Sequence, residues 1–506
     1  MQLNNVKDVS PVDVLIVGAG PAGLTLAIDL ARRGVRARVV ERGEGLFPGS
    51  RGKGLQPRTQ EVFDDLGVSG AVREAGGPYP PMLGWQDERP LGEFQMIERA
   101  DPGPDRPYHE IWMLPQWRTV EILYARLEEL GGGVEFGTAL TGLAQDAHGV
   151  TAHLAHADGS AGTARAAYLV AADGGRSTIR KALGIGMTGE TVDPAPTLIA
   201  DVVIAGLDRD RWHVWQHAKG GGIGLCPLAG TDQFQVAAQY DEPGAVPDTS
   251  PEAVRQLIAD RTHLTATDVR WSSTFTPRAA MADRFREGRV FLVGDAAHIH
   301  SPAGGQGLNT SVQDAYNLGW KLGQVVRHGA DPELLDSYEA ERLPVAAGVL
   351  GISTRIHRAH RSGDAEGRRR TTEVHQLGLT YQDGPLAMDD REDRGPVGAG
   401  DRAPDAPCAL PDGTPVRLFD VLRGPHFTLL VLGDATPPAT DFGGLAPTLA
   451  AAECLHTIRT GGPNPDLLDP DGHLAAAYGP GPATFLIRPD GYVCWATDGA
   501  RVRPTR

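Results

Sequence analysis

The fold of this chain is decided by residues 12–23, whose sequence is VDVLIVGAGPAG. The first six residues are mostly apolar and β-branched, which is typical of a buried parallel strand. Gly18 permits a tight turn, Gly20 lets the backbone approach a pyrophosphate, and Gly23 lets the following helix pack close to the strand. The N-terminus of that helix offers free N–H groups and a partial positive charge to phosphate. The stretch therefore predicts a dinucleotide-binding strand, turn and helix.

The residues that follow extend this unit in the expected order. The pattern predicts a helix as far as Arg33, capped by Gly34, and a second strand from Val35 to Val40. That strand ends at Glu41, about 20 residues beyond the turn, where a carboxylate can accept hydrogen bonds from the ribose hydroxyls of adenosine. By itself this unit does not distinguish NAD from FAD.

Two later segments also place a carboxylate at the end of a strand. Residues 168–180 (YLVAADGGRSTIR) predict a strand that ends at Asp173 before a helix. Residues 288–298 (GRVFLVGDAAH) predict another strand, which ends at Asp295. The glycine-rich turn 301–309 (SPAGGQGLN) then opens a long helix with apolar residues at helical spacing. Both acids are expected at the carboxyl edge of one sheet.

In their order and spacing, these three segments resemble the fingerprints of the class A flavoprotein monooxygenases, the single-component aromatic hydroxylases that include para-hydroxybenzoate hydroxylase. The sequence looks most similar to the branch that acts on polyketide aromatics and on rifamycin- or tetracycline-like antibiotics. The resemblance covers residues 12 to about 350. It implies an α/β fold: a Rossmann-like FAD-binding domain, a β-sheet substrate domain and a C-terminal thioredoxin-like domain.

The resemblance also implies roles for individual residues. Those expected to bind FAD are Gly18, Gly20, Gly23, Glu41, Arg42, Gln116, Asp173, Asp295, Pro302, Gly305, Gly307, Leu308 and Asn309. Within this set, Gln116 is expected at the phosphate–ribityl chain, Asp295 at the ribityl or pyrophosphate region, and residues 302–309 along the isoalloxazine ring. Arg51 and Pro302 are the residues expected beside the reacting flavin, and Asp173 is also expected to serve pyridine-nucleotide access.

Simpler interpretations stay open for several of these residues. Arg51 can be a surface cation on its loop. Asp173, like Arg180, can do no more than brace a turn and a helix. Trp212 and Trp215 lie three apart and so face opposite sides of a strand, where at least one is expected in the core and either can line a pocket for a planar ring.

The activity that the resemblance implies is aromatic hydroxylation. NAD(P)H, with NADPH favoured, reduces FAD, and a flavin C4a-hydroperoxide formed with O2 then hydroxylates an electron-rich ring, usually a phenol of polyketide type. The alternatives that remain are a Baeyer–Villiger or N-hydroxylating reaction on the same scaffold, an oxidase or dehydrogenase, and a flavin-bound, redox-responsive protein without turnover. An aromatic small molecule and O2 are the expected partners, and a homodimer is one option for the assembly.

Composition excludes several other classes of protein. A net charge of −16 provides no basic face for nucleic acid or an anionic membrane. The four cysteines are far apart and form no CxxC, which argues against a dithiol or zinc motif and fits a reducing compartment. His298 and His300 have no third ligand nearby in sequence, so no metal is expected. The apolar run 12–31 is interrupted by acids and glycines and is no membrane span, and residues 1–11 lack the apolar core of a signal peptide, so the cytoplasm is expected.

The chain is long enough for several domains. The predicted FAD-binding domain comprises residues 1–182 and 278–383, with strands of the substrate domain inserted around 77–112. Residues 183–277 are predicted to form the substrate-binding sheet, residues 384–407 a linker rich in proline and glycine, and residues 408–506 the thioredoxin-like domain. In that last part we expect a strand at Phe427–Leu432 and a hairpin that turns at 489–491.

Overall fold

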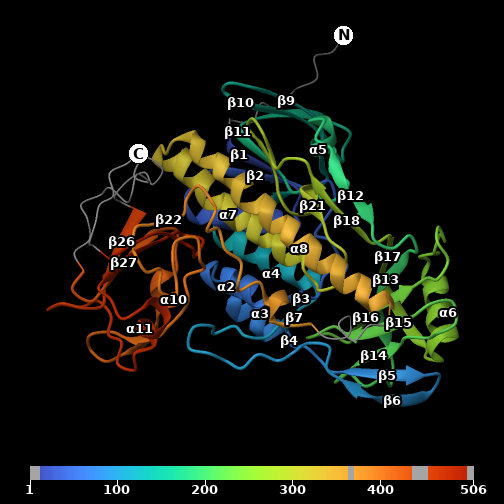
Figure 1. Cartoon of the computed structure of the whole chain (residues 1–506). Helices are drawn as coiled ribbons and strands as arrows, with labels where there is room; N and C mark the ends of the chain where they lie inside the picture. The colour runs from blue at the N-terminus through green and yellow to red at the C-terminus, as the bar shows by residue number, and fades with distance from the viewer. Residues whose placement is uncertain (1–11, 363–369, 436–453, 499–506) are drawn as a thin grey trace, which may run out of the picture.

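The computed structural model describes residues 12–362, 370–435 and 454–498. Its largest sheets have eight, seven and five strands. Figure 1 shows the five-stranded sheet at one side of the molecule and the seven-stranded sheet at the other, with two long helices, α7 (Gly307–His328) and α8 (Asp336–Ser362), running between them. This arrangement matches the predicted α/β class.

The eight-stranded sheet has the order β19-β20-β11-β1-β2-β8, and β10 and β9 continue from β11. Its strands are β1 (Val12–Val17), β2 (Ala37–Val40), β8 (Val134–Glu135), β9 (Thr138–Asp146), β10 (Gly149–His156), β11 (Ala161–Ala171), β19 (Arg286–Glu287) and β20 (Val290–Leu292). β1 is parallel to both β2 and β11, and β11 is parallel to β20. The carboxyl ends of these four strands therefore meet at one edge of the sheet.

Helices and short sheets surround this framework. The helices are α1 (Pro21–Arg32), α2 (Pro57–Asp65), α3 (Ser69–Ala75), α4 (Gln116–Glu129) and α5 (Thr178–Ala182), with 3-10 turns η1 (Gly294–Ala296), η2 (Pro332–Leu335) and η3 (Thr372–His375). The short sheets are β3 (Gly54–Leu55), β7 (Trp112–Met113) and β4 (Gly77–Pro78), and β12 (Met187–Thr191), β18 (Arg278–Ala282) and β21 (His298–Ile299). α1 packs closely on α7, where a Cβ on Gly319 would lie 2.3 Å from Asp29 Oδ2.

The seven-stranded sheet has the order β17-β13-β16-β15-β14-β5-β6. Its strands are β5 (Met82–Gln86), β6 (Arg89–Phe94), β13 (Thr197–Ile204), β14 (Trp212–Trp215), β15 (Ile223–Pro227), β16 (Gln233–Gln239) and β17 (Ala266–Phe275). The helix α6 (Pro251–Thr262) covers one face and shares an apolar core with it. β13, β15 and β16 lie within residues 183–277, where the sequence predicts a sheet.

The C-terminal unit is built on a five-stranded sheet of order β22-β28-β27-β25-β26. Its elements are β22 (Met388–Asp389), β23 (Pro407–Ala409), β24 (Pro415–Arg417), α10 (Leu418–Leu422), β25 (Phe427–Leu432), β26 (Leu455–Arg459), α11 (His473–Tyr478), β27 (Ala483–Ile487) and β28 (Val493–Thr497). The predicted strand β25 and the predicted hairpin of β27 with β28 are confirmed. The thioredoxin-like assignment and the other predicted domain limits stay predictions.

The segment 384–407 is not a free linker, and that prediction is wrong. β22 pairs with β28 at the edge of the C-terminal sheet. Val397, Ala403 and Ala406 are buried in the core of the same unit. Proline and glycine shape close turns here rather than a flexible connection, and composition alone cannot separate these two uses.

Candidate active site

The edge where the four parallel strands end collects the acids and glycines that the sequence singled out. Gly18 and Gly20 follow β1, Glu41 follows β2, Asp173 lies two residues after β11, and Asp295 follows β20 within η1. β2 and β11 flank β1 on opposite sides, so the chain crosses over the sheet in two directions from this point. Such a switch point is where open α/β sheets bind dinucleotides.

The three positions of the first turn are occupied by glycine for different physical reasons. Gly18 has φ +110°, and a Cβ there would lie 2.3 Å from the carbonyl oxygen of Ala172. A Cβ on Gly23 would lie 1.9 Å from the carbonyl oxygen of Gly18. Glycine is required at these two positions because a side chain would clash with the protein's own backbone. Gly20 meets no protein atom within 4 Å and caps α1 without a side-chain hydrogen bond, so the space beside it and the helix N–H groups are open to a ligand. This cradle fits a pyrophosphate.

Glu41 joins the end of β2 to the glycine turn. Its carboxylate accepts hydrogen bonds from the backbone N–H of Ala19 (2.9 Å) and of Gly43 (2.9 Å). The neighbouring Arg42 is exposed on the same loop. The carboxylate is thus held at the mouth of the cradle, as an acceptor for ribose hydroxyls must be.

Asp173 and Asp295 have different surroundings at this edge. Asp173 accepts the backbone N–H of Thr178 (2.8 Å) at the start of α5, and Arg180 donates to the carbonyl of Ala296 (3.0 Å), so both brace a turn, as the structural interpretation anticipated. The remaining oxygen of Asp173, Oδ1, is buried and has no hydrogen-bond partner among the described residues. Asp295 is exposed just after the carboxyl end of β20, and its contact with the ribityl or pyrophosphate region stays a prediction.

The glycine-rich turn 301–309 leads into α7 as predicted, and the helix begins at Gly307. Gly304 and Gly305 both have positive φ (+88° and +63°), a backbone conformation that favours glycine. The N-cap Gln306 makes no side-chain cap, so the first N–H groups of this 22-residue helix carry no such bond. Pro302 is exposed on the turn, and its carbonyl accepts the N–H of Gly305 (3.2 Å). The turn can present N–H donors to an anionic edge of a ring.

A second loop, residues 49–56, is held tightly against this turn. The side chain of Asn309 accepts the N–H of Gln56 (2.8 Å) and donates to the carbonyl of Gly54 (2.9 Å). Gln116, at the start of α4, accepts the N–H of Gly52 through its side chain (2.9 Å) and donates its own N–H to the carbonyl of Gly52 (2.9 Å). Leu308 also contacts this loop, because a Cβ on Gly52 would lie 3.1 Å from its Cδ1. Gln116, Leu308 and Asn309 therefore position the loop.

Arg51 projects from that loop and is exposed. Its guanidinium lies over the ring of Phe47, 5.4 Å from the centroid, and donates weakly to Ser273 on β17 (3.4 Å). It also lies close enough to Asp295 to interact with it electrostatically. Arg51 is thus a cation between the strand edge and the seven-stranded sheet, and its role beside the flavin stays a prediction.

The other face of loop 49–56 lies against the seven-stranded sheet. Gly49 packs on Trp271, whose ring a Cβ would meet at 2.2 Å. The ammonium of Lys53 lies 4.5 Å from the centroid of Trp212 and donates to the side chain of Gln235. Trp215 points away from the loop and stacks on Trp85 in the core on the other side. Of the two tryptophans, Trp212 is the one on the loop side.

Sequence reasoning did not identify Lys53, Gln235 or the neighbouring Asp201 as site residues. Lys53 is separated from Gln235 by more than 180 positions along the chain, and only the sheet brings them together. One signal was present: Asp201 interrupts the apolar run LIADVVI of a strand that is otherwise buried. A lone acid in such a run calls for a partner or a ligand.

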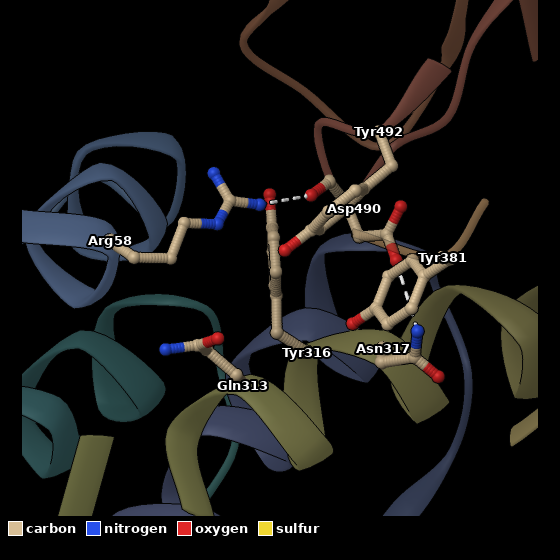
Figure 2. A pocket seen from close by; sticks show the side chains of 7 residues that line it. All are labelled: Arg58, Gln313, Tyr316, Asn317, Tyr381, Asp490 and Tyr492. Atoms are coloured by element: carbon tan, nitrogen blue, oxygen red, sulfur yellow. Dashed lines mark hydrogen bonds between the residues drawn. The ribbon is translucent and has the colours of Figure 1, made fainter. Parts of the chain in front are cut away.

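A network of buried charge joins the C-terminal unit to α7 and α8. Arg488 pairs with Glu341 of α8 (2.6 Å), and Lys321 of α7 pairs with the same carboxylate (2.7 Å). Figure 2 shows the neighbouring small pocket, where Arg58 of α2 donates to the carbonyl of Asp490 (2.6 Å) and Asn317 approaches the Asp490 carboxylate. α2 and α7 both start beside the glycine-rich turn 301–309, and this network holds the start of α2 and the middle of α7 against the C-terminal unit.

Histidines near the turn are engaged with each other. His298 contacts Asp314 (2.5 Å), and His300 contacts His298 (2.9 Å). Arg342 also pairs with Asp314, and although burial opposes ionisation, His298 and Arg342 outweigh it and lower the pKa of Asp314 to about 2. Among the described residues no cluster of His, Cys, Asp or Glu could hold a metal ion, and no helix there is long and apolar enough to cross a membrane.

Comparison with known proteins agrees with this geometry. Residues 11–353 match the family model described as FAD binding domain, and residues 397–506 match the one described as aromatic-ring hydroxylase, C-terminal. The chain belongs to the FAD-dependent aromatic hydroxylase family. The cradle at Gly18–Gly23, the carboxylate of Glu41 and the exposed Asp295 all lie within the part of the chain that matches the FAD binding domain.

Relatives match over nearly the whole length of the chain. A flavin-dependent monooxygenase of Mycobacteroides abscessus is 45% identical, over 96% of this chain and 98% of the relative. The 6-methylpretetramide 4-monooxygenase of Streptomyces rimosus is 36% identical, over 95% of this chain and 90% of the relative. The solved ternary complex of aklavinone-11 hydroxylase with FAD and aklavinone is 30% identical, with a TM-score of 0.79 over 99% of this chain and 97% of that one. This chain is an FAD-dependent oxidoreductase of the monooxygenase type.

Proposed function

We propose that this enzyme uses NADPH and O2 to hydroxylate a phenolic, polyketide-type aromatic compound between the flavin edge and the seven-stranded sheet. The observation that carries the proposal is the position of loop 49–56 between the glycine-rich turn 301–309 and the seven-stranded sheet. One side of the loop is hydrogen-bonded to Asn309 of the glycine-rich turn 301–309 and to Gln116 at the start of α4. The other side lies against the seven-stranded sheet through Trp271 and Lys53. The names of relatives that act on 6-methylpretetramide and aklavinone support a polycyclic substrate.

When bound, FAD supplies the transfer of electrons from NADPH and the activation of O2. The residues of the chain supply position and charge. Gly20 and the N-terminus of α1 hold the pyrophosphate, and Glu41 holds the ribose. The turn at Gly305 and Gly307 directs backbone N–H groups and the positive end of α7 towards the ring, where negative charge develops on reduction. Pro302 borders the ring, and Arg51 attracts the anionic reductant.

The substrate side is supplied by the sheet. Trp212 presents an indole for stacking against a planar ring, on the face towards loop 49–56. Apolar neighbours of that region belong to one buried cluster, which includes Met82, Met113 and Cys226. An apolar enclosure of this kind excludes water from the reacting oxygen. We place the enzyme in the cytoplasm, in keeping with four cysteines that are all free, and a homodimer stays a prediction.

The test is a screen of NADPH and NADH oxidation with a panel of polycyclic phenols, with the structure of each product determined. The proposal predicts that at least one phenol accelerates NADPH oxidation more than NADH oxidation and leaves as a ring-hydroxylated product. Gly20→Val, which should lack FAD, serves as the blank. A lactone or an N-oxide as the product would replace hydroxylation with the alternative reaction, and a yellow protein that no phenol stimulates would contradict turnover altogether.

A further inference from the structure

A chain of three buried glutamines leads from the glycine-rich turn 301–309 towards the C-terminal unit. The side chain of Gln306 donates an N–H to the carbonyl of Gly304 (2.8 Å), and its oxygen accepts from Gln376 (2.7 Å). The side-chain oxygen of Gln376 accepts in turn from Gln313 of α7 (2.5 Å). All three glutamines are at most 4% exposed. The chain therefore joins the turn to the interior of the protein without passing through solvent.

The direction of this chain is fixed by backbone carbonyls. Gln306 faces the carbonyls of Gly304 and Val374 (2.8 and 3.1 Å), and because a carbonyl can only accept, the amide nitrogen of Gln306 is the atom that meets them. Every amide of the chain then donates towards the turn. The oxygen of Gln313 is left at the far end as an acceptor. That atom is buried and has no hydrogen-bond partner among the described residues.

This end of the chain lies on the wall of a small cavity, where α2, α7 and the C-terminal unit meet (Figure 2). The wall includes Gln313, Arg58 of α2, and Tyr492 of the loop between β27 and β28. Arg58 Nε and the hydroxyl of Tyr492 are also buried without a hydrogen-bond partner in the described part of the chain. The space open to the centre of a water molecule is about 10 Å³, which is close to the least that one water needs.

The chemistry of these three atoms selects a neutral ligand that both donates and accepts. Arg58 Nε can only donate, Gln313 Oε1 can only accept, and the hydroxyl of Tyr492 can do either. The two charged residues of the wall, Arg58 and Asp490, already form ion pairs within the protein. An ion in the cavity would therefore add an uncompensated charge to a buried site. Water meets the size, the charge and the hydrogen-bonding requirement.

We propose that this cavity binds one ordered water molecule, and that Tyr492 is a positioning residue for the glycine-rich turn 301–309, acting through this water and the glutamine chain. The water accepts from Arg58 and from Tyr492 and donates to Gln313. Each of the three polar atoms then has a partner, and the water makes three hydrogen bonds, which is the usual number for a buried water.

The other end of the chain holds the peptide that joins Gly304 to Gly305. Both residues have positive φ, and glycine adopts several backbone conformations at similar cost. The hydrogen bond from Gln306 to the carbonyl of Gly304 selects one orientation of this peptide. The inference rests on the proposed function, because that function places the flavin ring along this turn. It gives the C-terminal unit a part in FAD binding.

The first test is a crystal structure of the FAD-bound enzyme. It should show one water within about 2.7–3.2 Å of Arg58 Nε, Gln313 Oε1 and the hydroxyl oxygen of Tyr492. The second test is Tyr492→Phe, which keeps the ring and removes the hydroxyl. This variant should bind FAD about 2- to 10-fold more weakly, an effect of the size of one hydrogen bond, and should alter the visible circular dichroism of the bound flavin.

The matched control is Tyr478→Phe. It removes a buried hydroxyl of the same C-terminal unit, which donates to the carbonyl of Pro404 (2.8 Å) and has no link to the glutamine chain. It should lower Tm at least as much as Tyr492→Phe and leave FAD affinity and the flavin spectrum as in wild type. Gln313→Met interrupts the chain itself, so adding Tyr492→Phe to Gln313→Met should weaken FAD binding no further.

A wild-type structure without this water, FAD binding that Tyr492→Phe leaves unchanged, or equal weakening by Tyr478→Phe would overturn the proposal. If Gln313→Met fails to fold, the wild-type structure and the two tyrosine variants still decide. Unchanged FAD binding in Tyr492→Phe, when wild type hydroxylates a phenol, would refute this inference and leave the proposed function intact. Weakened FAD binding in Tyr492→Phe, when wild type turns over no phenol, would do the reverse.

Discussion

The five-stranded and the seven-stranded sheets lie at opposite sides of the molecule (Figure 1), and each carries a cluster of buried charge that is built differently. At the junction with the C-terminal unit, Glu341 pairs with both Arg488 and Lys321. At the seven-stranded sheet, Asp201 is equally buried; Ser50 hydrogen-bonds to its carboxylate, but among the described residues no cation forms an ion pair with it. The carboxylate of Glu341 is paired with cations of the protein, and we call this the closed cluster. The carboxylate of Asp201 forms no ion pair among the described residues, and we call this the open cluster.

The difference teaches how a buried charge can be interpreted. A charge whose partners are all in the protein holds elements together, and its removal leaves the partners uncompensated. A buried charge without an ion-pair partner is costly to keep ionised and weakens the fold at the pH where it is charged. The glycines of the first turn follow the same rule, since Gly23 is fixed by the carbonyl of Gly18 while Gly20 faces open space.

The largest effect on stability is expected from removing the shared carboxylate of the closed cluster. Glu341→Gln should lower the free energy of unfolding by about 3–5 kcal/mol, because Arg488 and Lys321 lose their shared carboxylate. Burial opposes ionisation of Glu341, but Arg488 and Lys321 outweigh it and lower its pKa to about 2, so its contribution is full above pH 4.5 and is lost as the pH falls towards 2. Urea unfolding at several pH values measures this.

The control for that experiment is Glu252→Gln, which breaks an exposed pair with Arg255 and should cost at most about 0.5 kcal/mol. Equal losses in the two variants would mean that the closed cluster does not stabilise the junction.

The next effect concerns the glycine turn. Gly20→Val should give folded protein that has lost nearly all of its flavin, because the new side chain meets no protein atom but occupies the place of the pyrophosphate. Flavin absorbance and circular dichroism of the purified protein measure occupancy and fold. Gly23→Ala is the contrasting variant and should impair folding itself. Full FAD occupancy in Gly20→Val would show that the space beside Gly20 does not hold the pyrophosphate.

The open cluster should respond in the opposite direction to the closed one. The pKa of Asp201 rises from 3.8 to about 6 on folding, so the native state holds a proton more tightly than the unfolded state, and stability falls as the pH rises from about 4 to 6. At about 1.4 kcal/mol for each pKa unit, the loss amounts to about 3 kcal/mol. Asp201→Asn should therefore be more stable than wild type at pH 8, by about 1–3 kcal/mol.

The unfolding assay used for Glu341 also reads this gain, with Asp268→Asn on the exposed part of β17 as the control. A loss of stability in Asp201→Asn would show that the interactions of its carboxylate with Ser50 and Lys53 outweigh the cost of its burial, and the two clusters would then be of one kind.

The smallest effect is expected at Arg51. Arg51→Ala should slow reduction of the flavin by NADPH several-fold while leaving FAD affinity almost unchanged, because the side chain is exposed and its contacts in the protein are weak. Stopped-flow reduction without oxygen, at low and high salt, measures the rate. Rates equal to wild type at both salt concentrations would make Arg51 a surface cation.

The flavin side of the site could be predicted from the sequence because its signals are local. Gly18, Gly20 and Gly23 lie within six positions, and Asp295 directly follows its strand. The substrate side could not, because Asp201, Gln235 and Lys53 become neighbours through strand register and through a loop more than 140 residues away. Hydrophobic periodicity predicts the strands but does not give their order in the sheet.

The central claim is that the chain inserts one atom of O2 into a phenolic ring with electrons from NADPH. Turnover under 18O2 with a phenol that stimulates NADPH oxidation, followed by mass spectrometry of the product, tests it most directly. The account predicts a hydroxyl group carrying one labelled oxygen, formed by wild type and not by the flavin-free Gly20→Val. Oxidation of NADPH that yields hydrogen peroxide and unlabelled phenol with every member of the panel would contradict it.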